Sequence, residues 1–82
     1  MDLKGRVAVI TGASSGIGAG LAEYFVAQGM RVGLCSRRAP VLADGANVLS
    51  RSVDVTDEGA VVRFCDEVVA KFGPIDLWVN NA

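Results

Sequence analysis

Histidine is absent from the 82 residues of this sequence, and cysteine occurs only twice. Cys35 and Cys65 lie thirty residues apart and outside any C-x-x-C pattern. Zinc sites and dithiol redox motifs need other ligands or closer spacings, so we predict no metal site. We expect two buried thiols that stay reduced, which favours a cytoplasmic protein.

Long apolar runs and clusters of basic charge are also missing. No stretch of about 18 consecutive apolar residues occurs, so we expect no membrane span. Residues 1–6 lead into a short apolar segment that lacks the length and cleavage site of a signal peptide. Eight basic and nine acidic residues give a net charge of −1 without a basic run. This balance argues against a nucleic-acid partner.

Hydrophobic residues, by contrast, are abundant: they make up 51% of the chain, and its mean hydropathy is +0.40. A domain of this size buries only about 60% of the surface that its unfolded chain exposes. Such an apolar composition therefore predicts a part of a larger domain, whose inner surfaces are encoded without the segments that cover them.

Short apolar runs alternate with segments of helical periodicity. Strands are predicted at Arg6–Ile10, Arg31–Cys35, Val48–Val53 and Ile75–Val79. The first helix is predicted to end at Gly29, and the second to begin at an N-cap on Thr56 and to end at Gly73-Pro74. Their apolar faces are predicted from the spacing of Ile17, Leu21, Tyr24, Phe25 and Gln28, and of Val61, Phe64, Cys65, Val68 and Phe72.

This order of elements predicts an α/β fold: a Rossmann-type doubly wound parallel sheet, present as its N-terminal half and incomplete. Right-handed crossovers make 3-2-1-4 the expected strand order. Only about twelve residues, 36–47, connect the second and third strands, close to the minimum for a parallel crossover. We expect at most a turn or two of helix near Pro40–Ala43.

A glycine-rich turn, T-G-x-x-x-G-x-G, occupies residues 11–18. Gly12 permits a tight turn, Gly16 lets a pyrophosphate approach the backbone, and Gly18 lets the helix pack closely on the sheet. The free N–H groups of the helix start would face the phosphates, and Ser14 and Ser15 add hydroxyl donors. The same pattern also occurs in loops without a ligand, but its place between a strand and an amphipathic helix favours a dinucleotide cofactor.

The choice of cofactor depends on the end of the second strand, about twenty residues later. Ser36 is followed there by Arg37 and Arg38, and no acid occurs between Glu23 and Asp44. An acid would bind the ribose hydroxyls of NAD, whereas a guanidinium can bind the 2′-phosphate of NADP. NADP is therefore favoured over NAD, with Arg37 as the first choice for the contact. A solvated pair of surface arginines is the alternative.

Four motifs, in order along the whole chain, resemble the short-chain dehydrogenases/reductases. They are Leu3–Gly12, the D-V-T-D segment Asp54–Asp57, Phe72–Asp76, and Val79–Ala82, which is similar to the start of N-N-A-G. The resemblance implies a pyrophosphate site at Gly12, Ser14, Ser15, Gly16, Ile17 and Gly18. It also implies that Ser36 and Arg37 meet the adenosine ribose and its phosphate, Asp54 and Val55 the adenine, and Asn81 and Ala82 the inner ribose region.

Catalysis in this family depends on a downstream serine and a Y-x-x-x-K pair, and neither can be placed here. The only tyrosine, Tyr24, is followed four residues later by Gln28. We therefore assign no catalytic residue and expect residues 1–82 to be a partial NAD(P)-binding Rossmann domain that is inactive alone.

The resemblance implies that the intact parent is an oxidoreductase that transfers a hydride between NADP(H) and a carbonyl or alcohol substrate. A non-catalytic NADP-binding module or an inactive truncated product is the alternative. We expect the parent to be a homo-oligomer. The isolated chain is expected to self-associate, because its fourth strand is an apolar sheet edge.

Overall fold

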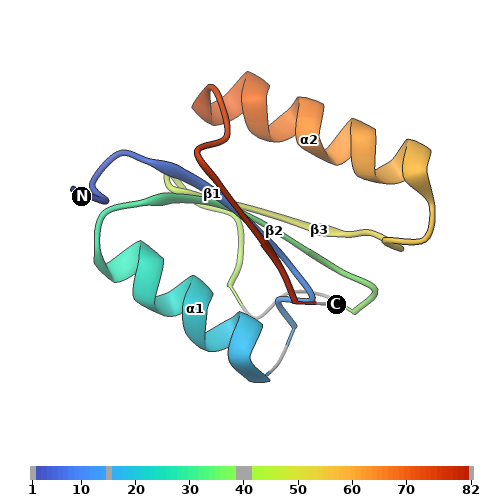
Figure 1. Ribbon diagram of the computed structural model, residues 1–82, viewed down its shortest axis with the longest axis horizontal. Coiled ribbons are helices and arrows are strands. Elements are labelled where there is room, and N and C mark those ends of the chain that lie inside the picture. Colours follow the sequence, from blue (N-terminus) through green and yellow to red (C-terminus); the bar gives the residue numbers. More distant parts are fainter. Residues whose placement is uncertain (1, 15, 39–41, 82) are drawn as a thin grey trace.

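The computed structural model describes residues 2–14, 16–38 and 42–81. One parallel sheet of order β3-β2-β1-β4 carries a helix on each face (Figure 1). The elements are β1 (Val7–Thr11), α1 (Gly16–Ala27), β2 (Arg31–Ser36), β3 (Val48–Ser52), α2 (Glu58–Phe72) and β4 (Leu77–Asn80). The Rossmann-type fold and the predicted strand order are confirmed.

Strand β1 is the centre of the structure and is buried along its whole length. Ala8 and Ile10 pack toward α1, whereas Val7 and Val9 pack toward α2. Burial on both faces follows from pairing at both edges, with β2 on one side and β4 on the other. The strand ends at Thr11, one residue later than predicted, which brings a hydroxyl to its carboxyl end.

The buried face of α1 differs from the prediction. Gly18, Ala22 and Phe25 are its buried residues, whereas Ile17 is 75% and Tyr24 is 54% exposed. The helical period was right, and Phe25 is buried as predicted, but the placement of Ile17 and Tyr24 on the buried face was wrong. Gly18 and Ala22 take their place beside Phe25 on the face toward the sheet.

The helix ends depend on two glycines and one aspartate. Gly29 has φ +82 and Gly73 has φ +95, and both terminate their helices as predicted. The N-cap prediction for α2 was wrong by one residue. Asp57, rather than Thr56, accepts a hydrogen bond from the Ala60 backbone N–H at 3.1 Å.

The connection between β2 and β3 makes polar contacts with α2 and β3, and its Leu42 packs against the core on the α1 side. Lys71 on α2 donates to the carbonyl oxygens of Gly45 (2.8 Å) and Val48 (3.1 Å), and Arg51 pairs with Asp44 at 3.0 Å. The helical turn expected near Pro40–Ala43 lies partly outside the described residues, and the described part, 42–43, is not helical.

The two cysteines differ in burial. Cys35 is fully buried in the α2-side core, whereas Cys65 is half-buried, so the expectation of two buried thiols holds only for Cys35. Burial, with a smaller effect of Cys65, raises the pKa of the Cys35 thiol to about 11. Its sulfur therefore stays protonated and a poor nucleophile at neutral pH. Neither described helix is long and apolar enough to cross a bilayer.

Candidate nucleotide-binding site

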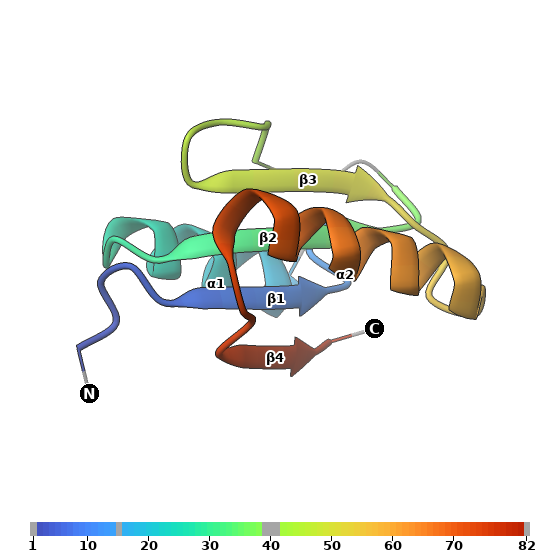
Figure 2. The ribbon, with the colours of Figure 1, turned by 90° about the horizontal axis from the view of Figure 1, so that it is seen from above.

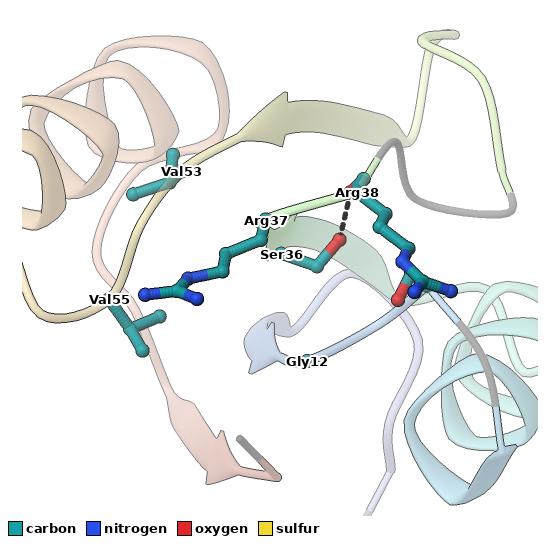
Figure 3. Close-up of a pocket in the computed structure, with 7 residues that line it drawn as sticks. Gly12, Ser36, Arg37, Arg38, Val53 and Val55 are labelled. Carbon is teal, nitrogen blue, oxygen red and sulfur yellow. Dashed lines mark hydrogen bonds between the residues drawn. The ribbon is translucent and has the colours of Figure 1, made fainter.

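All four strands end at the same side of the sheet, where the turn into α1 also lies (Figure 2). In open α/β sheets, ligands bind in the crevice at the carboxyl ends of the strands. A pocket of about 360 Å³ lies there (Figure 3). It is lined by Gly12, Ser14, Ser36, Arg37, Arg38, Val53 and Val55.

The glycine turn gives this pocket an open backbone wall. Gly12 and Gly16 have φ angles of +67° and +64°, a conformation that residues with a Cβ rarely adopt. Apart from its chain neighbours and the backbone of its own helix, no heavy atom of the described residues lies within 4 Å of the place that a Cβ on Gly16 would occupy. A phosphate can therefore approach this backbone at the start of α1, where free N–H groups favour an anion.

Gly18 closes the other side of the turn. A Cβ at this position would lie 2.6 Å from both the Gly12 carbonyl oxygen and the Asn81 Nδ2 atom. The Asn81 amide in turn donates to that carbonyl at 3.3 Å. Close packing of Gly18 was predicted, and Asn81 is the additional contact that completes it.

Thr11 joins the ends of β1 and β4, a role that the sequence analysis missed. Its hydroxyl lies 3.1 Å from the Asn80 Oδ1 atom, to which it donates, and it accepts from the Asn81 backbone N–H at 3.0 Å. A hydroxyl residue at the last position of a buried strand was the available signal. Asn80 and Asn81 thus form hydrogen bonds with Thr11 and Gly12 at the end of β1.

Two arginines form the basic side of the pocket. The Ser36 hydroxyl donates to the Arg38 carbonyl oxygen and so faces the chain rather than the pocket centre (Figure 3). The side chain of Arg37 extends toward Val55, whereas that of Arg38 extends toward the side of α1. Both guanidinium groups therefore border one pocket from different directions.

Asp54 lies beside this pocket and contacts Arg37. Its Oδ2 atom is 3.4 Å from Arg37 Nη2, and its Oδ1 atom accepts from the Thr56 backbone N–H (2.9 Å) and hydroxyl (2.7 Å). These Thr56 hydrogen bonds, with a smaller effect of Arg37, hold the pKa of Asp54 below its usual value. The carboxylate is therefore ionised at neutral pH.

The structure brings most of the predicted residues together. Gly12, Ser14, Ser36, Arg37 and Val55 line the pocket. Asp54 contacts Arg37. Helix α1 begins with Gly16 and Ile17. Gly18 and Asn81 pack against the Gly12 carbonyl of the turn. Arg38 and Val53 also line the pocket but were not selected as site residues. Ser15 and Ala82 lie outside the described residues.

Comparison with known proteins shows to which family the chain belongs. The family model described as short chain dehydrogenase matches residues 6–82. The chain belongs to the short-chain dehydrogenase family. Its members are oxidoreductases with an NAD(P)-binding fold, and this short-chain dehydrogenase chain has the pocket described above at the carboxyl ends of its strands.

Individual members of the family show how much of them the chain matches. A sorbitol dehydrogenase of Cereibacter sphaeroides is 37% identical over 87 residues, which cover 100% of this chain and 34% of the relative. A short-chain dehydrogenase/reductase structure from Serratia marcescens superposes with a TM-score of 0.85 at 34% identity, covering 100% of this chain and 37% of the other.

A 3-ketoacyl-(acyl-carrier-protein) reductase of Brucella melitensis, complexed with NADH, matches with a TM-score of 0.80 at 31% identity. That match covers 93% of this chain and 34% of the reductase. The chain spans about a third of the length of the curated relatives it matches.

Proposed function

We propose that residues 1–82 are the NADP(H)-binding part of an oxidoreductase that transfers a hydride between NADP(H) and a carbonyl or alcohol substrate. The observation that carries this proposal is the pocket itself. It combines an open glycine turn with two guanidinium groups, and no described residue among those that line it is acidic.

The residues present fit a dinucleotide with a 2′-phosphate. The turn at Gly12 and Gly16 would hold the pyrophosphate against backbone N–H groups. Arg37 can form a bidentate contact with a 2′-phosphate, which a carboxylate in its place would repel. The bound nicotinamide would supply the hydride chemistry, and the protein groups named here bind and orient the cofactor.

The residues that would transfer a proton to the substrate are not assigned in this chain. Tyr24 is half-exposed on α1, and the sequence contains no tyrosine followed four residues later by lysine. We therefore propose that the 82-residue chain binds NADPH without turning over a carbonyl substrate.

Titration of NADPH and NADH against Arg37→Ala tests the cofactor assignment. We expect the affinity for NADPH to fall about tenfold or more, because hydrogen bonds to a charged group contribute about 1.5–3 kcal/mol. The affinity for NADH should change little. Arg31→Ala is the matched control, because Arg31 is also exposed but lies at the opposite end of β2. Equal losses for both cofactors would contradict the 2′-phosphate assignment.

A further inference from the structure

The direction of the Arg37 side chain is set by a residue outside its own strand. The side chain is 73% exposed, so packing restrains it little. Its backbone carbonyl oxygen accepts a hydrogen bond from the Ser52 hydroxyl at 2.8 Å. This contact restrains the backbone at Arg37 but not the direction of its side chain. Among the described residues, Arg37 makes one ion pair, with Asp54, and its side chain extends toward Val55 (Figure 3).

Asp54 is itself held in place. Both donors of Thr56, the backbone N–H and the hydroxyl, bind the same oxygen, Oδ1. The Asp57 backbone N–H also donates to the Asp54 carbonyl oxygen at 3.0 Å, which tightens this turn before α2. Oδ2 is thereby left directed at Arg37. The ion pair thus connects the end of β2 to a turn whose geometry is already fixed.

The ion pair leaves most of the arginine available. A guanidinium has five N–H donors in a rigid fork, and the contact with Asp54 involves Nη2 alone. The remaining donors of Arg37 can still bind an anion in the pocket. Immobilising a free arginine costs up to about 2 kcal/mol of side-chain entropy. A partner that restricts the side chain beforehand lowers the cost of binding.

We propose that Asp54, fixed by Thr56, is a positioning residue that directs Arg37 into the pocket and thereby raises the preference for NADPH over NADH. The proposal rests on the proposed function and adds a residue that discriminates between the cofactors without itself binding the 2′-phosphate. The direct effect of a carboxylate on a nearby phosphate has the opposite sign, since the two anions repel. The sign of the change in preference therefore separates positioning from repulsion.

The experiment is a double-mutant cycle on the 82-residue chain, with dissociation constants for NADPH and NADH measured for each variant. Asp54→Asn should lower the NADPH preference by a factor between about 1.4 and about 5, the range expected from an exposed ion pair of about 0.2–1 kcal/mol. In the Arg37→Ala background the same change should leave the preference unaltered. Thr56→Val, which removes one of the two hydrogen bonds to Oδ1, should have the same effect to a smaller extent.

Asp44→Asn is the matched control, because Asp44 also pairs with an arginine, Arg51, but that arginine does not line the pocket. It should leave the cofactor preference unchanged. This inference alone would be overturned if Asp54→Asn increased the NADPH preference or weakened the binding of both cofactors equally. It would also be overturned if Asp54→Asn still lowered the NADPH preference in the Arg37→Ala background. If Arg37→Ala itself leaves the preference intact, or the unchanged chain binds no NADPH, the proposed function fails as well.

Discussion

Two glycines in α1 have opposite roles at the scale of single residues. A Cβ on Gly18 would lie 2.6 Å from the Gly12 carbonyl oxygen, whereas a Cβ on Gly20 would meet no described atom within 4 Å beyond its neighbours in the helix. Gly18→Ala should therefore lower the free energy of unfolding by about 1–3 kcal/mol through overpacking. Gly20→Ala should raise it by about 0.5–1 kcal/mol, because alanine favours the helix.

Urea unfolding followed by circular dichroism measures both effects. The pair is a matched test, since each variant adds one methyl group to the same helix. Loss of stability in both variants, or in neither, would contradict the close approach of α1 to the turn.

Residue types at the site could be predicted from the sequence, but their contacts could not. The spacing of Gly12, Gly16 and Gly18 after a buried strand predicted the tight turn and the close packing of Gly18, and the structure has both. The contact between Arg37 and Asp54 joins residues 17 positions apart. It depends on side-chain directions that local sequence does not determine, and the same holds for Arg38.

The start of α2 shows the same limit at the scale of elements. Thr56 and Asp57 are both favourable N-cap residues, and the sequence does not decide between them. The Thr56 hydroxyl is engaged by Asp54, and Asp57 is left to cap the helix. The helix itself was predictable, because its apolar residues recur at helical spacing and Gly73-Pro74 ends it.

Replacement of the cap residue tests this assignment. Asp57→Ala should lower the free energy of unfolding by about 1 kcal/mol, the usual cost of losing an N-cap side chain. Asp66→Ala, an exposed position within α2 and outside its first turn, should not lower it. Thermal unfolding of the two variants measures both effects. A larger loss of stability in Asp66→Ala than in Asp57→Ala would show that Asp57 is not the cap.

Helix α1 shows why the predicted face of an element can be misplaced. Apolar spacing identified the helix, but large apolar residues were assumed to face the core. Gly18 and Ala22 are buried beside Phe25, whereas Ile17 and Tyr24 are exposed, and a Cβ on Gly18 would already lie too close to the Gly12 carbonyl oxygen. A sequence pattern shows which residues are hydrophobic, but it does not show how closely two elements approach each other.

The two edges of the sheet differ at the scale of the whole molecule. The β3 edge is bordered by charged residues, and Asp44 accepts a hydrogen bond from the Ser50 backbone N–H. The β4 edge has no charged residue between Leu77 and Asn80, and Trp78 is 43% exposed. Exposed apolar edges promote pairing between chains. We therefore propose that the 82-residue chain self-associates through β4.

Light scattering coupled to size-exclusion chromatography tests this proposal. Trp78→Lys should shift the chain toward the monomer, because charge on an edge strand opposes pairing. Val62→Lys is the control, since Val62 is 58% exposed on α2 and not on the sheet edge. Equal shifts in the two variants would indicate non-specific apolar association, and a monomeric unchanged chain would refute the proposal.

The strand order was predictable because right-handed crossovers leave few arrangements for strand–helix–strand units. The structure of the connection between β2 and β3 was harder to predict from the sequence. The expectation there was at most a turn or two of helix, and the structure uses polar contacts of Lys71 and Arg51 with this connection. Such contacts link distant residues and leave no periodic signal.

Trp78 is also the only tryptophan of the sequence. Excitation selective for tryptophan therefore reports on a single side chain, which lies on the β4 edge and borders a cavity with Thr11 and Val55 near the strand ends. Its emission maximum would report whether that edge is in water or covered. Because reduced nicotinamide absorbs where tryptophan emits, quenching of the same signal would report the arrival of NADPH.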